Sequence, residues 1–469
     1  MYFWRKLQTD PRAAAFATAF GAFCLVLFSP GIFNDGDTYW HIAAGRWMID
    51  NRAVLHIDPF SYTFAGKPWQ AHEWLSEILI ALAYVGLSWN GLALLFAATF
   101  ALTAGLMSWH LSRRLSGLTL VTVIILALSC CTPSLLTRPH MLALPLLEIW
   151  TAGLIRARAE NRPPSWKLLI AIALWANLHG SFLFGLALIV PFLFEMISAP
   201  HSKTEIKGWG LFLLLSCIAA AATPNGIETL TFPFRLMKMP ELYGISEWQP
   251  TELTGLQPAL ITIGATLFVL LSRGARIPVW RLVTLLGLLY MSLLQARHGQ
   301  IMAITGALLL AEPLGMALHN GPRNGKVNVR CGEIFLALIL IASAARLLFP
   351  IRALENAVSP SAALAHVPEA YRHQPVLNSY AFGGYLIFNE IPPFIDGRAE
   401  LYGGEFLAQY IKISSGDMNS IQKVLQRYRI GWVIAAPGSA LAQRFEQMPD
   451  WQRQYADRVA IVFIRRKSS

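Results

Sequence analysis

The sequence predicts an α-helical polytopic membrane protein with about 11 transmembrane helices and a small C-terminal extracytoplasmic α/β domain. Three observations predict this fold class: the composition is apolar and poor in charge, many apolar runs can span a bilayer, and the composition changes after residue 350. Of the 469 residues, 55% are hydrophobic and 14% are charged, against about 25% charged residues in a soluble domain. A soluble globule of this length would need more polar surface, so that class is excluded. The same apolar composition also excludes a disordered chain, a fibre and a disulfide scaffold.

The net charge of +11 comes from 38 Lys and Arg against 27 Asp and Glu. These basic residues form no single cluster in the sequence, and Lys and Arg mark the cytoplasmic loops of membrane proteins. We therefore expect membrane lipids among the partners of this chain, and no nucleic acid. The five cysteines lie in or beside apolar runs without a CxxC motif, so neither a zinc site nor a disulfide framework is indicated.

The membrane domain is predicted over residues 1–349 from eleven apolar runs. A transmembrane helix needs about 17–25 such residues, and shorter helices can pack inside a bundle. The first run lacks a small-residue cleavage site, so we interpret it as an uncleaved span. The runs are 13–33, 91–111, 117–132, 141–155, 166–179, 181–197, 208–223, 257–272, 280–296, 299–318 and 331–349.

The placement of charge sets the orientation of these spans. With the N-terminus in the cytoplasm, 17 Lys and Arg fall in cytoplasmic segments, among them Arg5, Lys6, Arg323 and Lys326. The outer loops before the last span hold only 7, as the positive-inside rule requires. An odd number of spans then puts the C-terminus on the extracytoplasmic side.

The first outer loop, residues 34–90, is predicted to carry two helices in the outer membrane interface, at 38–50 and 72–88. The second of these is apolar enough to be a span. Counting it as one would move Arg113 and Arg114 to the outer side and would invert every later loop. We therefore predict that it lies in or near the interface.

Residues 350–469 are predicted to form the extracytoplasmic α/β domain, because this segment contains no further spanning run. The apolar stretches at 431–434 and 459–464 are typical of strands. The patterns at 406–413 and 420–428 favour helices. The segment is long enough to have a core of its own.

Polar side chains that are unusual in membrane spans gather in the predicted outer loop and outer turns. Ionisable groups at membrane depth are costly and often mark a pathway or a site. The alternative is that loop residues are simply polar. The candidate residues are Asp35, Asp37, His41, His72, Glu73, Arg138, His140, Asn177, His179, Arg297 and His298.

The spacing of Asp37 and His41, four residues apart on a predicted helix, puts both side chains on one face. A carboxylate beside a histidine at the edge of a membrane can act as a general base toward a hydroxyl, or it can bind a divalent cation. No cofactor is certain, and a metal ion such as Mg or Mn is the one that these carboxylates could take. The alternative function of Asp35 and Asp37 is N-capping of the helix.

Arg138, Arg297 and His298 supply positive charge at the same depth and are candidates to hold a lipid-linked phosphate. The alternative is anchoring to lipid headgroups. In the C-terminal domain, Asp396 and Arg398 flank a glycine, and an aromatic Gly turn lies at 380–385. Such elements can bind sugars, and they are as often an ion pair at the end of a strand and a tight turn.

The loop motif Asn-Asp-Gly-Asp-Thr-Tyr-Trp-His at 34–41 is followed by Gly-Arg-Trp-Met at 45–48, by the helix from His72, and by Leu-Ser-Arg-Arg-Leu at 111–115. In this layout the chain resembles the GT-C superfamily of integral membrane glycosyltransferases, which includes protein O-mannosyltransferases, the aminoarabinose transferase of lipid A and the oligosaccharyltransferase. The resemblance covers roughly the first 200 residues by pattern and the rest by architecture. The turns at 175–180, 380–385 and 396–398 resemble a largely uncharacterised bacterial branch.

This resemblance implies a hexosyl- or pentosyltransferase of the bacterial inner membrane. Its donor would be a sugar on a polyprenyl phosphate, and its acceptor a lipid, glycan or protein of the cell envelope at the outer face. Asp37 falls where many of these enzymes have the carboxylate that activates the acceptor, and Asp35 is the second choice. Thr38 follows Asp37 in place of the Glu of the common Asp-Glu pair. A flippase of a lipid-linked glycan and a non-catalytic scaffold remain the alternatives.

Overall fold

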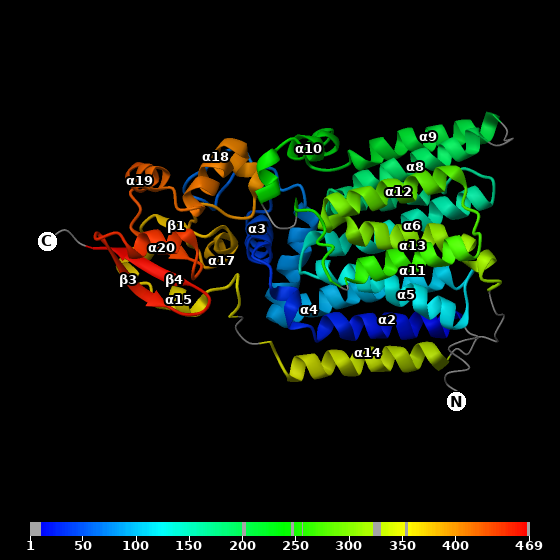
Figure 1. Ribbon diagram of the computed structural model, residues 1–469, viewed down its shortest axis with the longest axis horizontal. Coiled ribbons are helices and arrows are strands. Elements are labelled where there is room, and N and C mark those ends of the chain that lie inside the picture. The colour runs from blue at the N-terminus through cyan, green and yellow to red at the C-terminus, as the bar shows by residue number, and fades with distance from the viewer. Residues whose placement is uncertain are drawn as a thin grey trace.

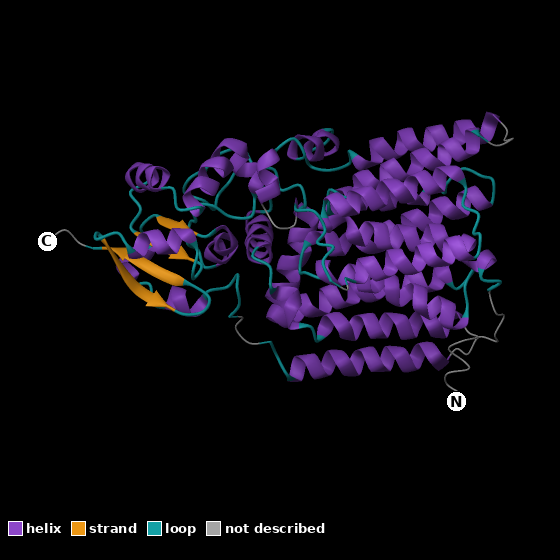
Figure 2. Ribbon diagram, in the orientation of Figure 1, coloured by secondary structure: helices purple, strands orange, loops and turns teal. Residues whose placement is uncertain are grey.

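The computed structural model describes residues 11–198, 203–244, 248–255, 257–321, 330–351 and 355–466. Most of these residues are helical, and one small sheet lies near the C-terminus, as Figure 2 shows. Most helices before residue 350 run side by side in a bundle along the long axis of the molecule, and the sheet lies beyond one end of it (Figure 1). The basic residues Arg5, Lys6, Arg323 and Lys326 lie outside the described residues.

All eleven predicted apolar runs fall on helices of the bundle. These helices are α2 (Pro11–Leu27), α4 (Trp74–Leu111), α5 (Gly117–Cys131), α6 (Pro139–Ala159), α7 (Lys167–Leu178), α8 (Phe182–Ile197), α9 (Lys203–Ala220), α11 (Pro258–Ser272), α12 (Val279–Leu294), α13 (Gly299–Ala317) and α14 (Arg330–Leu348). A further helix, α10 (Glu228–Leu236), lies between α9 and α11. The apolar runs thus predict the helices of the bundle.

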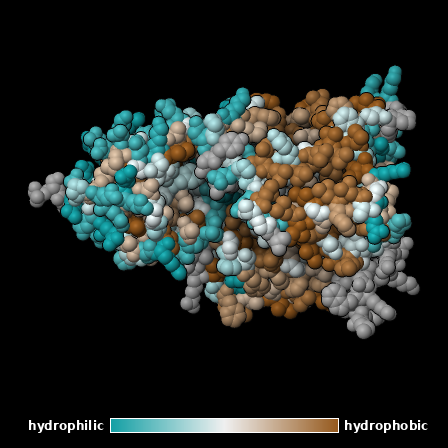
Figure 3. Space-filling view, in the orientation of Figure 1, coloured by the Kyte–Doolittle hydropathy of each residue, from teal (hydrophilic) through white to brown (hydrophobic). Residues whose placement is uncertain are grey.

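Three helical segments of the described chain are long and apolar enough to cross a membrane, namely Trp74–Leu111, Gly117–Ser134 and Ala296–Ala317. Shorter apolar helices accompany them, and side chains such as Leu118, Ile170 and Leu271 are 78%, 74% and 80% exposed. Figure 3 shows hydrophobic residues over the bundle and hydrophilic residues over the C-terminal part. An exposed apolar surface of this kind suits a lipid environment. The number of spans stays a prediction.

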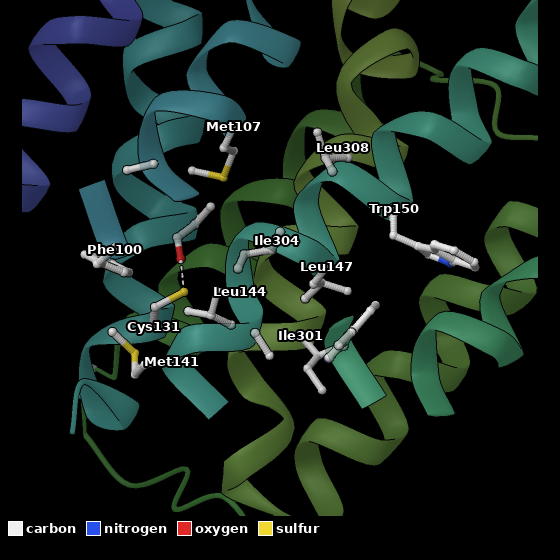
Figure 4. Close-up of a cluster of buried hydrophobic side chains, with 14 of the residues drawn as sticks. Phe100, Met107, Cys131, Met141, Leu144, Leu147, Trp150, Ile301, Ile304 and Leu308 are labelled. Carbon is white, nitrogen blue, oxygen red and sulfur yellow. Dashed lines mark hydrogen bonds between the residues drawn. The ribbon is translucent and has the colours of Figure 1, made fainter. Parts of the chain in front are cut away.

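The interior of the bundle is filled by large apolar side chains from helices that are distant in sequence. Figure 4 shows this core, to which α4, α5, α6 and α13 contribute. Trp150 and Phe100 are among its fully buried members. The Trp150 indole donates to the Gly185 carbonyl oxygen at 2.7 Å, so its one polar atom is satisfied inside the core.

The first outer loop contains the two helical segments that the sequence predicts. One is α3 (Asp37–Asn51), and the other is the first part of α4, which is interrupted at Leu87 and Ser88 by non-helical backbone. The two parts of α4 approach each other closely at this break. A Cβ on Gly91, after the break, would overlap the carbonyl oxygen of Ala83, before it. The segment before the break is therefore a separate helix, and its position in the membrane interface stays a prediction.

The C-terminal part contains a four-stranded sheet with the order β1-β2-β4-β3. The strands are β1 (Val376–Asn378), β2 (Trp432–Ala435), β3 (Trp451–Ala456) and β4 (Ile461–Arg465). β1 pairs parallel to β2, with Val376 opposite Trp432, and the other pairs are antiparallel. Strands predicted at 431–434 and 459–464 are confirmed as β2 and β4, with small shifts of their ends.

Six helices accompany this sheet. They are α15 (Ser361–Ala365), α16 (Glu369–Arg372), α17 (Gly383–Phe388), α18 (Ala399–Ser414), α19 (Met418–Arg427) and α20 (Ala440–Glu446). The helices predicted at 406–413 and 420–428 coincide with α18 and α19. The α/β character of residues 350–469 is therefore confirmed within the described residues.

The first outer loop and the C-terminal part share one hydrophobic core. Trp40 and Trp69 of the loop are buried together with Phe394 and Tyr402 of the C-terminal part. The Trp69 indole donates to Glu400 at 2.9 Å. The loop thus packs against residues more than 300 positions away in the sequence. This packing fixes the loop between the bundle and the sheet.

Candidate active site

The candidate site begins where the chain leaves η1 (Pro30–Phe33) and enters α3. Gly36 is the N-cap of α3, and no side chain caps the helix through a hydrogen bond there. The Asp35 carboxylate accepts a long hydrogen bond of 3.3 Å from the backbone N–H of Asp37. N-capping is therefore a minor part of what these two carboxylates do, and their main partner lies on another helix.

That partner is Arg138, which precedes α6. Its Nε and Nη2 donate to the two oxygens of Asp35, both at 2.6 Å, and Nη2 also lies 2.9 Å from Oδ2 of Asp37. This is the bidentate geometry in which a planar guanidinium pairs with a carboxylate. Thr38 and Thr137 lie next to this pair, with their hydroxyl oxygens 2.6 Å apart. The structure thus brings the predicted candidates Asp35, Asp37 and Arg138 together, through an ion pair that the sequence analysis did not predict.

The two carboxylates differ in exposure. The Asp35 side chain is 2% exposed and the Asp37 side chain is 18% exposed. The Trp40 indole donates to Oδ1 of Asp37 at 3.0 Å. Asp37 is therefore the carboxylate that a substrate can approach, while the buried Asp35 holds the Arg138 guanidinium in position.

The C-terminal part reaches this site through Gly397. A Cβ on Gly397 would overlap Oδ1 of Asp37 and would come within 3.1 Å of the Trp40 indole nitrogen. Only glycine leaves room for the carboxylate here. Sequence analysis singled out the residues on each side of this glycine and missed the glycine itself.

Histidines and glutamates form a second cluster beside the carboxylate pair. Glu73 lies within ion-pair distance of three histidines: His179 at 3.3 Å, His72 at 3.8 Å and His41 at 4.0 Å. The other nitrogen of His41 lies 3.4 Å from Glu77. Glu73 and Glu77 thus both lie next to the His41 ring. Glu77, which the candidate set omits, is a buried member of this cluster.

Burial shifts the pKa of two members of this cluster in opposite directions. Burial, with the charge of Arg138 next, lowers the pKa of His41 well below its usual value. Burial likewise raises the pKa of Glu73. Both effects follow from the cost of removing a charge from water. At neutral pH His41 therefore accepts or donates a hydrogen bond as an uncharged imidazole.

A metal site would need several His, Cys, Asp or Glu side chains of the described residues to converge on one point. No group of three or more His, Cys, Asp or Glu among them is arranged to hold a metal ion.

Two further candidates, Asn177 and His140, lie at the same end of the bundle. Oδ1 of Asn177 accepts from the Trp74 indole at 2.8 Å, which ties the end of α7 to the start of α4. The His140 ring lies 6.0 Å from the His179 ring, and its Nε2 is 2.9 Å from the Ser134 carbonyl oxygen. Asn177 is thus a structural link, and His140 borders the histidine cluster.

Arg297 and His298 lie in η5 (Ala296–His298), between α12 and α13. The Arg297 guanidinium stacks 4.3 Å from the centre of the Trp248 ring. Nδ1 of His298 lies 3.3 Å from the Met291 carbonyl oxygen. After burial and the charge of His140, the positive charge of Arg297 also lowers the pKa of His179, so Arg297 lies near the histidine cluster.

Asp396 and Arg398 lie in a fully buried network. Arg398 donates to both oxygens of Asp396 and, at 2.7 Å, to Asp58 of the first loop. The Tyr402 hydroxyl donates to Asp396 at 2.6 Å. Burial alone would lower the pKa of Arg398, and the carboxylate of Asp396 instead raises it well above its usual value. The structure favours the ion-pair alternative for these two residues, which join the loop to the C-terminal part.

The structure thus combines a helix bundle, a loop with a carboxylate pair after the first helix, and a C-terminal part that packs on this loop. No family model and no curated protein matches the sequence. Among solved structures, the Archaeoglobus fulgidus oligosaccharyltransferase in the apo form matches with a TM-score of 0.55 and 12% identity, over 91% of this chain and 69% of that one. The same enzyme tethered to an acceptor peptide matches with a TM-score of 0.54 and 12% identity, over 92% and 70%.

ArnT from Cupriavidus metallidurans bound to undecaprenyl phosphate matches with a TM-score of 0.51 and 14% identity, over 96% of this chain and 97% of that one. At these identities the likeness concerns the fold alone. At this level the predicted resemblance in fold is confirmed, because the matching structures are an oligosaccharyltransferase and ArnT.

Proposed function

We propose that this protein is a membrane glycosyltransferase that moves a sugar from a polyprenyl-phosphate donor to a cell-envelope acceptor at the outer face of the membrane. The observation that carries the proposal is the partly exposed Asp37 carboxylate, oriented by Arg138 and Trp40 beside a buried Asp35. Two enzymes of the same fold support it, one solved with undecaprenyl phosphate and one with an acceptor peptide.

In this mechanism Asp37 removes the proton from the acceptor hydroxyl as that oxygen attacks the anomeric carbon of the donor. The bond between the anomeric carbon and the phosphate oxygen breaks, and the polyprenyl phosphate leaves with both electrons of the bond. Arg138, at 2.9 Å from Asp37, supplies positive charge next to the reacting atoms. Fixed positive charge near a developing anion stabilises the transition state.

The experiment incubates the purified protein with a panel of polyprenyl-phosphate hexoses and pentoses and with lipid, glycan and peptide acceptors. Mass spectrometry measures consumption of the donor. Asp37→Asn should lower the rate by about 100-fold or more, the usual contribution of a general base. Asp50→Asn, an exposed carboxylate at the other end of α3, is the matched control and should keep full activity. Full activity in Asp37→Asn would overturn the proposed base.

The proposed localisation is the bacterial inner membrane, with the N-terminus in the cytoplasm and the C-terminal part outside. The distribution of Lys and Arg among the loops supports this orientation. Alkaline phosphatase fused after the last residue should be active in cells, because the enzyme folds only outside the cytoplasm. An inactive fusion that is well expressed would contradict the orientation.

A further inference from the structure

A cavity of about 700 Å³ lies among the helix ends that are farthest from the sheet and the candidate site. Figure 1 shows this end of the bundle. The C-terminal ends of α4, α6 and α13 and the N-terminal ends of α7 and α12 form its walls. The predicted cytoplasmic loops lie at this end. The cavity is separate from the residues to which the proposed transfer reaction is assigned.

Basic side chains dominate the polar part of this cavity. Two carboxylates, Glu160 and Glu312, also line it. The basic residues are Arg113, Arg114, Arg156, Arg162, Lys167 and Arg281. With three times as many cations as anions on its walls, the cavity carries excess positive charge.

The ion pairs leave part of this charge available. Glu160 accepts from Arg156 at 2.7 Å and from Arg162 at 2.5 Å. Within the described chain, exposed Lys167 lies within 4.0 Å of no carboxylate, and the guanidinium of Arg113 lies 5.6 Å from the centre of the Trp109 ring. Arg113 and Lys167 can therefore bind an anion without first breaking a salt bridge.

The surfaces between the basic side chains are apolar. Leu106, Ile149 and Leu308 line the cavity, and Ile149 is also 37% exposed on the outside of the bundle. Trp166, next to Lys167, is 50% exposed, and tryptophan is enriched at the boundary between lipid and water. A free phosphate gains nothing from apolar walls, whereas a lipid places its phosphate among the cations and its acyl chains along the exposed helix faces.

We propose that this cavity binds the phosphate group of an anionic phospholipid from the leaflet at this end of the bundle. Guanidinium groups pair with phosphate oxygens through parallel hydrogen bonds, and basic pockets between transmembrane helices bind anionic headgroups. The bound lipid contacts α4, α6, α7 and α13 together and so fixes the spacing of their ends. The proposal is independent of the proposed transfer reaction.

Native mass spectrometry of the full chain in detergent tests this site. The probes are dioleoylphosphatidylglycerol, dioleoylphosphatidylcholine and glycerol 3-phosphate. The wild type should retain phosphatidylglycerol at concentrations where the other two probes do not bind. The double variant Arg113→Gln, Lys167→Gln should bind it about tenfold or more weakly, because each cation near an anionic headgroup contributes to affinity.

The matched control is Arg273→Gln, Arg276→Gln, which removes two exposed cations from the turn between α11 and α12 at the same end of the bundle. These residues do not line the cavity, so phosphatidylglycerol should bind as in the wild type. Equal weakening by both double variants, or equal binding of phosphatidylcholine by the wild type, would overturn the site. Binding of glycerol 3-phosphate as tight as that of the lipid would overturn the lipid as its ligand.

Discussion

At the scale of single residues, the site depends on how the Arg138 guanidinium distributes its contacts between two carboxylates. Arg138 gives Asp35 two hydrogen bonds and Asp37 one contact. Sequence spacing identified all three residues and assigned Arg138 to a phosphate. It did not show that the carboxylates are the guanidinium's own partners, because residues 35 and 138 meet only through the packing of α6 against the loop.

This unequal distribution of the Arg138 contacts predicts different roles for Asp35 and Asp37. Asp35→Asn should lower stability by about 3 kcal/mol, since it breaks a buried pair and leaves the guanidinium with less compensation. Asp37→Asn should cost only about 1 kcal/mol, because the more exposed Asp37 makes fewer bonds to Arg138. Thermal unfolding in detergent measures both, with Asp50→Asn as the control. A larger loss in Asp37→Asn than in Asp35→Asn would contradict this division.

His41 predicts a pH dependence of stability. Burial, and next the charge of Arg138, lowers the pKa of His41 in the folded protein. Above the unfolded pKa of 6.5, His41 is neutral in both states and costs the folded protein no stability. As the pH falls below 6.5, the unfolded protein binds a proton at His41 more readily, so the folded protein loses stability. The loss should be about 1.4 kcal/mol per pH unit. Glu73, whose pKa is raised by burial, acts in the opposite direction on acidification. The test is therefore a difference between variants.

The melting temperature of the wild type, His41→Gln and His56→Gln is measured from pH 7.5 to pH 5.5. His41→Gln should lose less stability on acidification than the wild type does. His56 is exposed, so His56→Gln should follow the wild-type curve. Parallel curves for wild type and His41→Gln would show that His41 is not held neutral by the fold.

At the scale of elements, the apolar runs and the charge pattern predict most of the helices and the break in α4. Length and periodicity are local properties, so the sequence displays them directly. The close approach of α3 to α4 is not local. A Cβ on Gly45 of α3 would overlap the Glu77 carbonyl oxygen of α4. Nothing in the spacing of residue 45 indicates that another helix crosses there.

This crossing predicts the effect of a methyl group. Gly45→Ala should push α3 away from α4 and destabilise the protein by about 1–3 kcal/mol, the usual cost of overpacking. The measurement is again thermal unfolding in detergent. In Gly86→Ala the new methyl group meets open space, so that variant should be as stable as the wild type. Equal stability of Gly45→Ala and Gly86→Ala would mean that the two helices can separate freely.

At the scale of the whole molecule, the first loop acts as the joint between the bundle and the C-terminal part. Asp58 of the loop pairs with Arg398, and Thr63 donates to the Phe394 carbonyl oxygen at 2.9 Å. Sequence analysis predicts two domains and an outer loop, and it cannot predict that loop and C-terminal part share a core. Partners separated by more than 300 residues leave no periodic pattern in the chain.

The joint predicts that the C-terminal part shapes the active site through Gly397. A methyl group at Gly397 would collide with the Asp37 carboxylate and the Trp40 indole, and a displacement of about 1 Å can lower a rate by about 100-fold. Gly397→Ala should therefore lose donor consumption by about that factor. Gly404→Ala is the control, because its Cβ would meet only the movable carboxylate of Glu241, and it should remain active. Wild-type rates in Gly397→Ala would mean that the C-terminal part does not fix the position of the proposed base.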